Sequence, residues 1–274
     1  MHFSEDNNLK VREFQQKGFI TVSGLFPSEE ADLLLSLIRS TRESLPRSSL
    51  NRSLLRFYSN VYKQNESIQQ IVSSQKVLDI LTPIAGPDLW IRWDQAVMKE
   101  PGGEEFPWHQ DNGYNRLRVE HYQLWIALSD MKEEDGGLWL LPGSHLRGIK
   151  KHKNVAHHQI TTVNDAGAVK VEANKGDAVL FSSLLLHKTS QNVTTRNRWA
   201  YVVEYMSQQD FDPFVKPPYF LVSENGLSHP QWVETYPGSR NSANIMKYLD
   251  LLLQEKYKAT ANRLKSGIRK IFRG

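Results

Sequence analysis

The stretch HYQLWIAL, residues 121–128, decides the fold of this chain because its side chains alternate between two kinds. An alternation with a period of two is typical of a β-strand whose two faces meet different surroundings. The apolar set is Tyr122, Leu124, Ile126 and Leu128, and the mixed set is His121, Gln123, Trp125 and Ala127. We expect a β-barrel with helices outside it, in which the apolar set faces outward and Gln123 and Trp125 face the interior.

The same short, aromatic or β-branched composition recurs on both sides of this stretch, at residues 89–98, 138–141, 169–172, 178–182 and 199–206. Turn sequences separate these segments: Pro101-Gly102-Gly103, Gly136-Gly137, Pro142-Gly143-Ser144 and Lys175-Gly176-Asp177. Short strands at this spacing indicate a barrel or a sandwich.

Residues 1–88 predict helices instead. A short helix over about 8–16 ends near Gly18, and an extended segment follows at 19–26. A second helix opens at Pro27, with Ser28 as its cap, and a third covers about 75–84. We therefore predict one domain over 1–274, with a helical part at 1–88, a β core at 89–206 and a C-terminal extension at 207–274.

Composition excludes several classes of protein. A hydrophobic content of 39% and seven tryptophans suffice for a sizeable core. No apolar run approaches the roughly 20 residues of a membrane span, and the N-terminus lacks the pattern of a secretory signal. The absence of cysteine removes disulfides, thiolate nucleophiles, zinc–thiolate sites and iron–sulfur clusters. We expect a cytoplasmic protein. Its oligomeric state can be that of a monomer or of a homodimer.

The positive charge of the chain is concentrated at its C-terminus. Residues 245–274 carry eight Lys or Arg and two Asp or Glu, a balance of +6, so the rest of the +4 chain is near −2. The body therefore lacks the basic surface of a nucleic-acid-binding protein. The tail predicts a basic amphipathic helix, which either packs on the barrel or on a second subunit, or binds a membrane surface or a partner.

The chemistry of the chain is indicated by His109, Asp111 and His187. Residues two apart on a strand point to the same side, so His109 and Asp111 can bind one metal ion, and His187 supplies a third ligand from a distant strand. Two histidines and one carboxylate with open positions are typical of non-haem iron(II) oxygenases. Arg198, eleven residues after His187, suits a cosubstrate that bears a carboxylate.

Each of these residues taken alone has an ordinary alternative. A His-x-Asp pair arises easily in a chain with nine histidines, His187 can be a residue at a barrel rim, and Arg198 can be a surface ion-pair partner. Their order along the chain and their positions at strand ends favour one joint site.

The chain resembles the phytanoyl-CoA dioxygenase-like (PhyH) family of iron(II)/2-oxoglutarate-dependent oxygenases. The resemblance runs from about residue 9 to 206 and rests on sequence motifs: Phe14-Gln15-Gln16-Lys17-Gly18-Phe19-Ile20, Lys99-Glu100-Pro101-Gly102, Trp108-His109-Gln110-Asp111, Leu124-Trp125-Ile126-Ala127-Leu128, Gly136-Gly137-Leu138, and His187 to Arg198. It implies a mainly β fold, the double-stranded β-helix or jelly-roll of cupin-like proteins, with flanking N-terminal helices and a C-terminal helix.

The resemblance also implies the roles of several residues. His109, Asp111 and His187 would bind iron(II), and Arg198 would pair with 2-oxoglutarate, with Arg196 as a rival. Thr189, Lys99, Gln95 and Trp125 resemble positions that contact the cosubstrate or line the pocket. The cofactors implied are iron(II), 2-oxoglutarate and dioxygen, with ascorbate as an optional reductant.

The expected reaction is hydroxylation, or oxidative tailoring such as demethylation, of a small-molecule metabolite or natural-product intermediate, with release of succinate and carbon dioxide. Halogenation is disfavoured, because related halogenases replace the carboxylate of Asp111 with glycine or alanine. An acyl-CoA hydroxylase and a non-catalytic cupin-like binding module are the alternatives. The candidate substrate residues are Arg56, Tyr58, Trp108, Asn112, Tyr114 and Arg116.

The remaining histidines predict no further metal site. The Pro142-Gly143-Ser144-His145 motif is interpreted as a structural turn. We expect His152, His157 and His158, in a lysine-rich loop, to be solvated.

Overall fold

The computed structural model describes residues 5–41, 54–115, 117, 119–155, 158–236, 238 and 253. The basic C-terminal segment predicted to be a helix lies outside the described residues, apart from Leu253, as do Arg116 and His157.

The chain begins with helices and continues mainly as strands. The helices are α1 (Glu5–Lys17), α2 (Ser28–Ser40), α3 (Glu66–Val72), α4 (Gln75–Ala85) and α5 (Asp111–Asn115), with short 3-10 turns η2 (Tyr62–Gln64) and η3 (Ser144–Arg147). The first strands are β1 (Phe19–Val22), β2 (Leu55–Ser59), β3 (Leu89–Lys99), β4 (Phe106–His109), β5 (Tyr122–Ala127), β6 (Leu138–Leu140) and β7 (Lys153–Val155). The later strands are β8 (His158–Ile160), β9 (Val169–Val171), β10 (Ala178–Ser182), β11 (His187–Thr189), β12 (Arg198–Ser207), β13 (Tyr219–Glu224) and β14 (Leu227–Val233).

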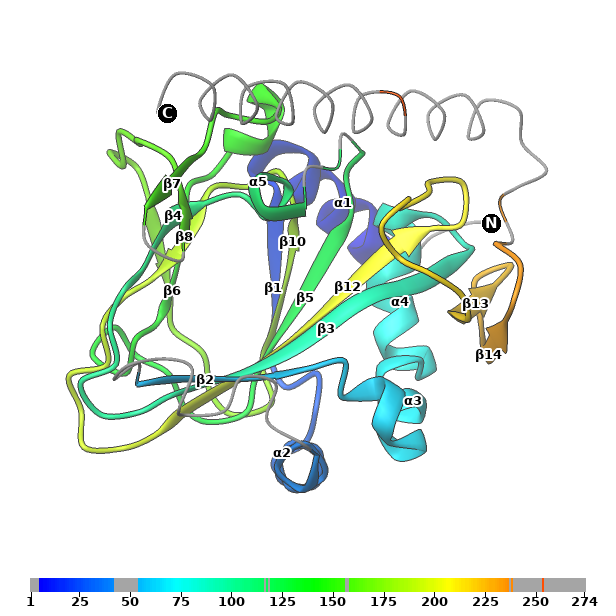
Figure 1. Cartoon of the computed structure of the whole chain (residues 1–274), viewed down its shortest axis with the longest axis horizontal. Coiled ribbons are helices and arrows are strands. Elements are labelled where there is room, and N and C mark those ends of the chain that lie inside the picture. Colours follow the sequence, from blue (N-terminus) through cyan, green and yellow to red (C-terminus); the bar gives the residue numbers. More distant parts are fainter. Residues whose placement is uncertain are drawn as a thin grey trace, which may run out of the picture.

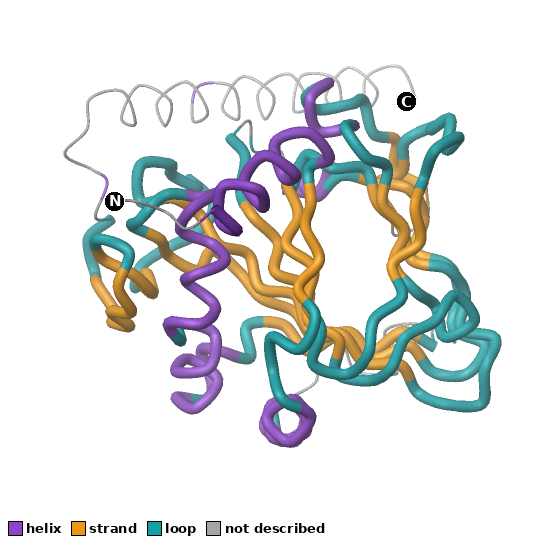
Figure 2. Tube along the Cα trace, turned by 180° about the vertical axis from the view of Figure 1, so that it is seen from behind, coloured by secondary structure: helices purple, strands orange, loops and turns teal. Residues whose placement is uncertain are grey.

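Two antiparallel sheets face each other, which is the jelly-roll arrangement expected from the sequence (Figure 1). Within the described residues, the major sheet has the strand order β1-β10-β5-β12-β3-β13-β14, with β2 also paired to β3. The minor sheet has the order β4-β11-β6-β9, and β7 pairs with β8. Figure 2 shows the two walls of strands, with the helices gathered outside the major sheet.

The two faces of β5 lie as the sequence predicts. Leu124 and Ile126 belong to a core cluster that includes Leu34 of α2 and Leu78 of α4, so this face packs against the helices. Trp125 and Ala127 belong to a second cluster, shared with residues of the minor sheet and therefore between the sheets: Leu138, Leu140 and Val171. We call the face of the major sheet that carries Trp125 its inner face.

The predicted helices form, with one correction at a cap. Helix α1 ends where Gly18 takes a φ of 83°, a conformation that favours glycine. Ser28 is the first residue of α2 rather than its cap, because Pro27 holds the cap position and makes no side-chain hydrogen bond there. Among the residues that the structure describes, no helix is both long and apolar enough to cross a membrane.

Three strands of the major sheet fall where the sequence predicts none, and β7 and β8 pair with each other in the segment predicted to be a lysine-rich loop. Strand β2 interrupts the helical part, and β13 and β14 extend the major sheet within residues 207–274. Pro230 argues against a strand, but β14 is the last strand of the described sheet, and Pro230 lies at the register shift between β13 and β14, outside the paired positions. These strands depend on pairing with distant partners, which a local pattern does not reveal.

Candidate metal centre

The register of the minor sheet brings two histidines together. Strand β11 pairs with β4, and the Cα atoms of His187 and His109 are direct partners across this ladder. The two imidazole centroids are 4.0 Å apart, and both side chains are buried. The sheet therefore fixes the separation of the rings before any ligand binds.

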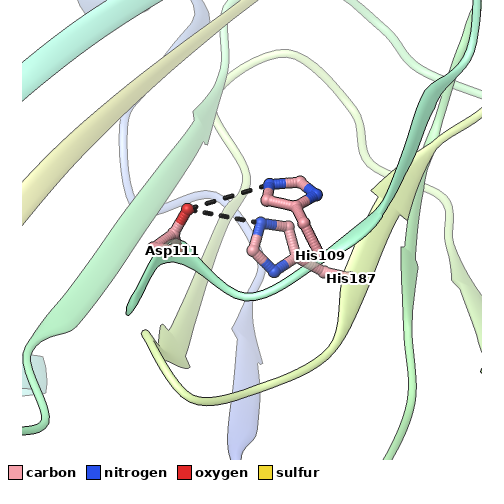
Figure 3. A group of neighbouring side chains, drawn as sticks. All are labelled: His109, Asp111 and His187. Atoms are coloured by element: carbon pink, nitrogen blue, oxygen red, sulfur yellow. Dashed lines mark ion pairs between the residues drawn. The ribbon is translucent and has the colours of Figure 1, made fainter. Parts of the chain in front are cut away.

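Asp111 joins them from a helix and not from a strand. Strand β4 ends at His109, and Asp111 is the first residue of α5, which corrects the expectation that a shared strand face brings the pair together. Its Oδ1 lies 3.8 Å from Nε2 of His109 and 3.7 Å from Nε2 of His187 (Figure 3). Possible ligand atoms of all three residues lie within 4.8 Å of one another.

Hydrogen bonds to the backbone orient both imidazoles. Nδ1 of His109 lies 2.8 Å from the Pro107 carbonyl, and Nδ1 of His187 lies 2.9 Å from the Leu185 carbonyl. Because a carbonyl only accepts, each Nδ1 carries the proton and each Nε2 presents a lone pair toward Asp111. This arrangement, with a backbone partner behind each ring, is common for metal-bound histidines.

Burial keeps the three side chains ready for a cation. Burial, and secondarily the neighbouring His187, lowers the pKa of His109, and burial lowers the pKa of His187 to about 4, so both rings are neutral near pH 7. Burial, followed by the charge of Glu204, raises the pKa of Asp111, whose Oδ2 is buried with no hydrogen-bond partner in the described structure. A divalent cation would compensate for this cost, so the residues fit a metal ion with nitrogen and oxygen ligands.

Gln110 braces the turn between the strand and the helix. Its fully buried amide donates to the carbonyls of Leu184 (2.5 Å) and Gly148 (2.9 Å) and accepts from the backbone of Lys150 (2.8 Å). The backbone N–H of Gln110 donates to Nε2 of His152 at 3.0 Å. His152 is therefore half-buried and hydrogen-bonded rather than solvated. No pattern in the sequence indicates the supporting roles of Gln110 and His152.

We expect Gln110→Ala to weaken iron(II) affinity about 10- to 100-fold, the usual cost of removing a group that orients metal ligands. The substitution leaves three backbone groups without partners and frees the angle between His109 and Asp111. Anaerobic equilibrium dialysis against iron(II) measures the affinity. Gln191→Ala, at an exposed glutamine, is the matched control, and equal affinities of the two variants would contradict the bracing role.

Two buried cationic side chains lie on the inner face of the major sheet, at the first residue of β12 and the last residue of β3. The Cα atoms of Arg198 on β12 and Lys99 on β3 are direct partners, and their side chains are 3% and 0% exposed. Lys99 donates to the Thr189 hydroxyl (2.9 Å) and the Ser190 carbonyl (2.6 Å), and Arg198 donates to the Gly136 carbonyl (2.5 Å). A Cβ atom at Gly136 would lie 2.7 Å from Lys99 Cδ, so glycine makes room for the lysine.

These two cations lack a carboxylate among their described hydrogen-bond partners. Asp135, whose charge acts on Arg198, pairs instead with the exposed Arg196 at 3.0 Å, and Arg198 Nε is buried with no hydrogen-bond partner in the described structure. Burial lowers the pKa of Arg198 to about 10, and burial followed by the charge of Arg198 lowers the pKa of Lys99 to about 7. Two adjacent buried cations require an anion, and the geometry favours Arg198 over Arg196.

Three further predicted residues lie near these groups. Gln95 and Trp125 are both Cα partners of Val202 and share its inner face, although Gln95 already donates to Ser59 at 2.8 Å. The ring of Tyr114 stands edge-on to His109, with centroids 5.4 Å apart.

Four predicted substrate residues are not brought to the site. Arg56 pairs with Glu100 (2.7 Å), and Tyr58 packs on Trp199 in the cluster on the helix side, because even-numbered residues of β2 face away from the interior. Trp108 alternates with His109 and lies under the Lys188 ammonium. Asn112 uses both amide protons on the carbonyls of Leu117 and Val119, so it holds a loop. The remaining predicted substrate residue, Arg116, lies outside the described residues.

Of two other histidines, one lies as the sequence predicts and the other does not. His145 lies in the turn η3 and packs against Phe14, as the structural interpretation predicts. His158 was expected to be solvated, but its ring stands edge-on to Phe106 at a centroid distance of 4.6 Å.

Comparison with known proteins gives a consistent assignment. A family model described as phytanoyl-CoA dioxygenase (PhyH) matches residues 14–200. A probable alpha-ketoglutarate-dependent hypophosphite dioxygenase of Stutzerimonas stutzeri is 26% identical over 158 residues, which are 53% of this chain and only 55% of that protein. The ectoine dioxygenase of Stutzerimonas stutzeri (strain A1501) is 23% identical over 252 residues, covering 78% of this chain and 82% of that protein.

Solved structures share the fold. The epimerase SnoN in complex with Fe3+, alpha ketoglutarate and nogalamycin RO superposes with a TM-score of 0.63 and 15% identity, covering 82% of this chain and 95% of that one. At 15% sequence identity, this structural similarity indicates a shared fold and no more.

Proposed function

Because this chain belongs to the phytanoyl-CoA dioxygenase (PhyH) family of iron(II)- and 2-oxoglutarate-dependent dioxygenases, we propose that it oxidises a C–H bond of a small organic molecule. The observation that carries the proposal is the convergence of two Nε2 lone pairs and one buried carboxylate oxygen. In this proposal His109, Asp111 and His187 bind the metal.

The cosubstrate assignment rests on the buried cations. We propose that Arg198 and Lys99 bind the distal carboxylate of 2-oxoglutarate and that the Thr189 hydroxyl donates a further hydrogen bond. The planar guanidinium of Arg198, with an unpartnered Nε, suits bidentate binding of a carboxylate. The Lys99 ammonium would then replace its hydrogen bond to the Ser190 carbonyl with an ion pair to the distal carboxylate of 2-oxoglutarate.

Iron(II) with 2-oxoglutarate and dioxygen, when bound, supplies the oxidation of a C–H bond with release of succinate and carbon dioxide. The chain contributes position and environment. His109 and His187 keep their Nδ1 protons on backbone carbonyls, so their Nε2 atoms stay available. Trp125 and Val202 lie beside Gln95 on the inner face, where their apolar side chains would exclude water. Because Asp111 retains its carboxylate, we propose hydroxylation or a related oxidative tailoring and not halogenation.

Two less direct features complete the proposal. The strands of both sheets and the helices that cover them share continuous clusters, which supports one domain over 1–274. The absence of cysteine supports a cytoplasmic location.

The test is anaerobic reconstitution of the purified chain with iron(II) and 2-oxoglutarate. We expect the weak visible charge-transfer absorption of the chelated cosubstrate, followed on exposure to air by formation of succinate. A metal-loaded protein that shows neither absorption nor succinate would contradict the proposed function.

The affinity for 2-oxoglutarate is expected to fall as the pH rises from 7 to 9. Without a bound anion, burial and then Arg198 lower the pKa of Lys99 to about 7. A bound carboxylate raises this pKa, so binding takes up a proton above pH 7, and the affinity falls by up to about tenfold per pH unit. Titration of the charge-transfer absorption with 2-oxoglutarate at saturating iron(II) measures this. Lys99→Met should bind weakly at every pH, whereas an equally steep profile in Lys99→Met would refute the assignment.

A further inference from the structure

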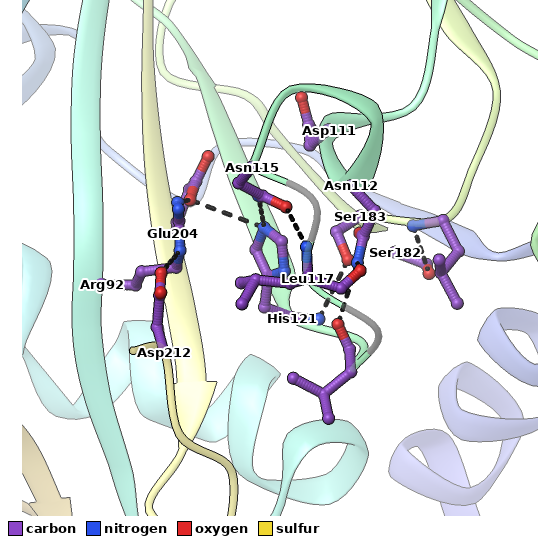
Figure 4. A network of polar contacts seen from close by, with 12 residues as sticks. Arg92, Asp111, Asn112, Asn115, Leu117, His121, Ser182, Ser183, Glu204 and Asp212 are labelled. Carbon is purple, nitrogen blue, oxygen red and sulfur yellow. Dashed lines mark hydrogen bonds and ion pairs between the residues drawn. The ribbon is translucent and has the colours of Figure 1, made fainter. Parts of the chain in front are cut away.

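A second buried polar network lies beyond the metal centre, at the far end of α5 (Figure 4). Arg92 forms ion pairs with Glu204 and with Asp212, and all three side chains are nearly or fully buried. His121 lies 3.5 Å from Glu204 Oε2 and 3.3 Å from the Asn115 amide. Helix α5 therefore carries Asp111 at its first residue and a contact to this network at its last.

Glu204 shares the inner face of β12 with Arg198. The two residues are six positions apart, so their Cα atoms are separated by about 20 Å along the strand. Helix α5 joins the metal-centre residue Asp111 to Glu204, because its last residue, Asn115, contacts His121, which lies 3.5 Å from the Glu204 carboxylate (Figure 4). Asp111 and Asn115 are about 6 Å apart along α5. Because the cosubstrate anchor occupies the Arg198 end, the Glu204 end is left for the molecule to be oxidised.

The network has bonding capacity that its described contacts do not use. Both the Arg92 and the His121 contacts are made by Oε2 of Glu204. The Cα partner of Glu204 on β5 is Gln123, which is 1% exposed; its side-chain amide faces the Glu204 carboxylate, whose pKa it helps to lower, and its Nε2 makes no other hydrogen bond in the described structure. An acceptor and a donor therefore stand side by side on the inner face.

The charges of the network do not balance. Arg92 contributes one positive charge against the two negative charges of Glu204 and Asp212, which leaves one negative charge among these three residues. His121 does not offset it, because burial lowers the pKa of His121 to about 4 and keeps the ring neutral near pH 7. A buried excess charge is costly unless a counter-charge arrives.

We infer that Glu204 and Gln123 form the substrate-recognition end of the inner face, and that the substrate carries a protonated nitrogen, as an ammonium, amidinium or guanidinium group. The cation binds the Glu204 carboxylate, and a neighbouring acceptor on the substrate takes the hydrogen bond of Gln123. Arg92 holds the carboxylate in position and is not itself in contact with the substrate. The inference rests on the proposed function, because it takes the oxidation to occur beside Asp111.

The experiment measures binding of small cations to the protein loaded with iron(II) and 2-oxoglutarate without oxygen. The probes are putrescine and agmatine, with 1,4-butanediol as a neutral analogue of similar length and N,N′-diacetylputrescine as a longer neutral analogue with the same four-carbon chain. Isothermal titration calorimetry gives each dissociation constant. We expect the cations to bind the wild-type protein at least about tenfold more tightly than their neutral analogues.

Glu204→Gln is expected to abolish this preference for cations and to leave the affinity for the neutral analogues unchanged. Glu224→Gln, at an exposed glutamate of β13, is the matched control and should behave as the wild type. Equal binding of charged and neutral probes by the wild type, or a preference that survives Glu204→Gln, would overturn the inference. The wild-type comparison needs no variant, so a poorly folded Glu204→Gln protein does not remove the test.

The charge-transfer absorption recorded before each titration distinguishes a failure of the proposed oxygenase function from a failure of the inferred cation recognition. If that absorption is missing, the proposed function fails. If it is present and the cations show no preference, the oxygenase assignment stands and the recognition of a protonated nitrogen is wrong.

Discussion

Replacing Asp111 with alanine is expected to lower succinate formation by more than about a hundredfold while leaving the metal-free protein at least as stable as the wild type. The activity falls because one of three metal ligands is lost, and even groups that only orient ligands cost 10- to 100-fold. The stability does not fall, because the carboxylate is partly buried, faces the negative charge of Glu204 and has an unpartnered Oδ2 in the described structure. The two measurements therefore move in different directions.

Thermal unfolding of the metal-free variant and bound iron per chain should be measured on the same preparation. Asp32→Ala, at an exposed carboxylate that pairs with Lys175, controls for the loss of any aspartate. His109→Ala should abolish activity equally, with the exposed His229→Ala as its control. Turnover that persists in Asp111→Ala or His109→Ala would show that the ligands are wrong.

Replacing Arg198 with methionine is expected to raise the KM for 2-oxoglutarate about 100- to 1000-fold with little change in bound iron. Truncating one partner of a buried charge pair costs about 2–5 kcal/mol, and a bidentate arginine stands in the upper part of that range. Methionine keeps much of the volume of the side chain in a site that is 3% exposed. The remaining Lys99, relieved of a neighbouring positive charge, retains some affinity for the cosubstrate.

Arg196 provides the matched control for this prediction. It lies two residues before Arg198, its side chain is 65% exposed, and it pairs with Asp135. Arg196→Met should leave the KM for 2-oxoglutarate within about twofold, since exposed ion pairs contribute 0–1 kcal/mol. If Arg196→Met raised the KM more than Arg198→Met, the cosubstrate anchor would have been assigned to the wrong arginine.

The sequence predicted most of the β core because period and turn chemistry act locally. Strand β10 lies at the residues expected, and β5 and β12 differ from expectation only at their ends. The opposite faces of Leu124 and Trp125 were also predicted, because a strand with one apolar and one mixed face leaves little freedom of register. Strands β2, β13 and β14 were missed because pairing with β3 and with each other, not local composition, makes them extended.

The sequence predicted the candidate metal and cosubstrate residues, but it did not predict the residues that hold them in place or those that would contact the substrate. The residue types at His109, Asp111, His187 and Arg198 are specific enough to identify from spacing. The candidate substrate residues were selected because they are aromatic or polar residues expected near the metal-binding motif. The alternation of side chains along a strand instead directs Tyr58 and Trp108 away from the interior between the sheets. Glu204 was missed because it lies within a long apolar strand, ninety-three residues after Asp111, and only the register with Gln123 and the contact with Arg92 reveal it.

The division of the site between two sheets has a thermodynamic consequence. The two histidines belong to the minor sheet, whereas the buried cations Lys99 and Arg198 belong to the major sheet. In the proposed complex, one small molecule would contact the metal on one wall and the cations on the other, and so would act as a strut between them. Metal and cosubstrate would then strengthen each other's binding by the same factor, because linkage is reciprocal. The chain would retain its iron most firmly when 2-oxoglutarate is abundant.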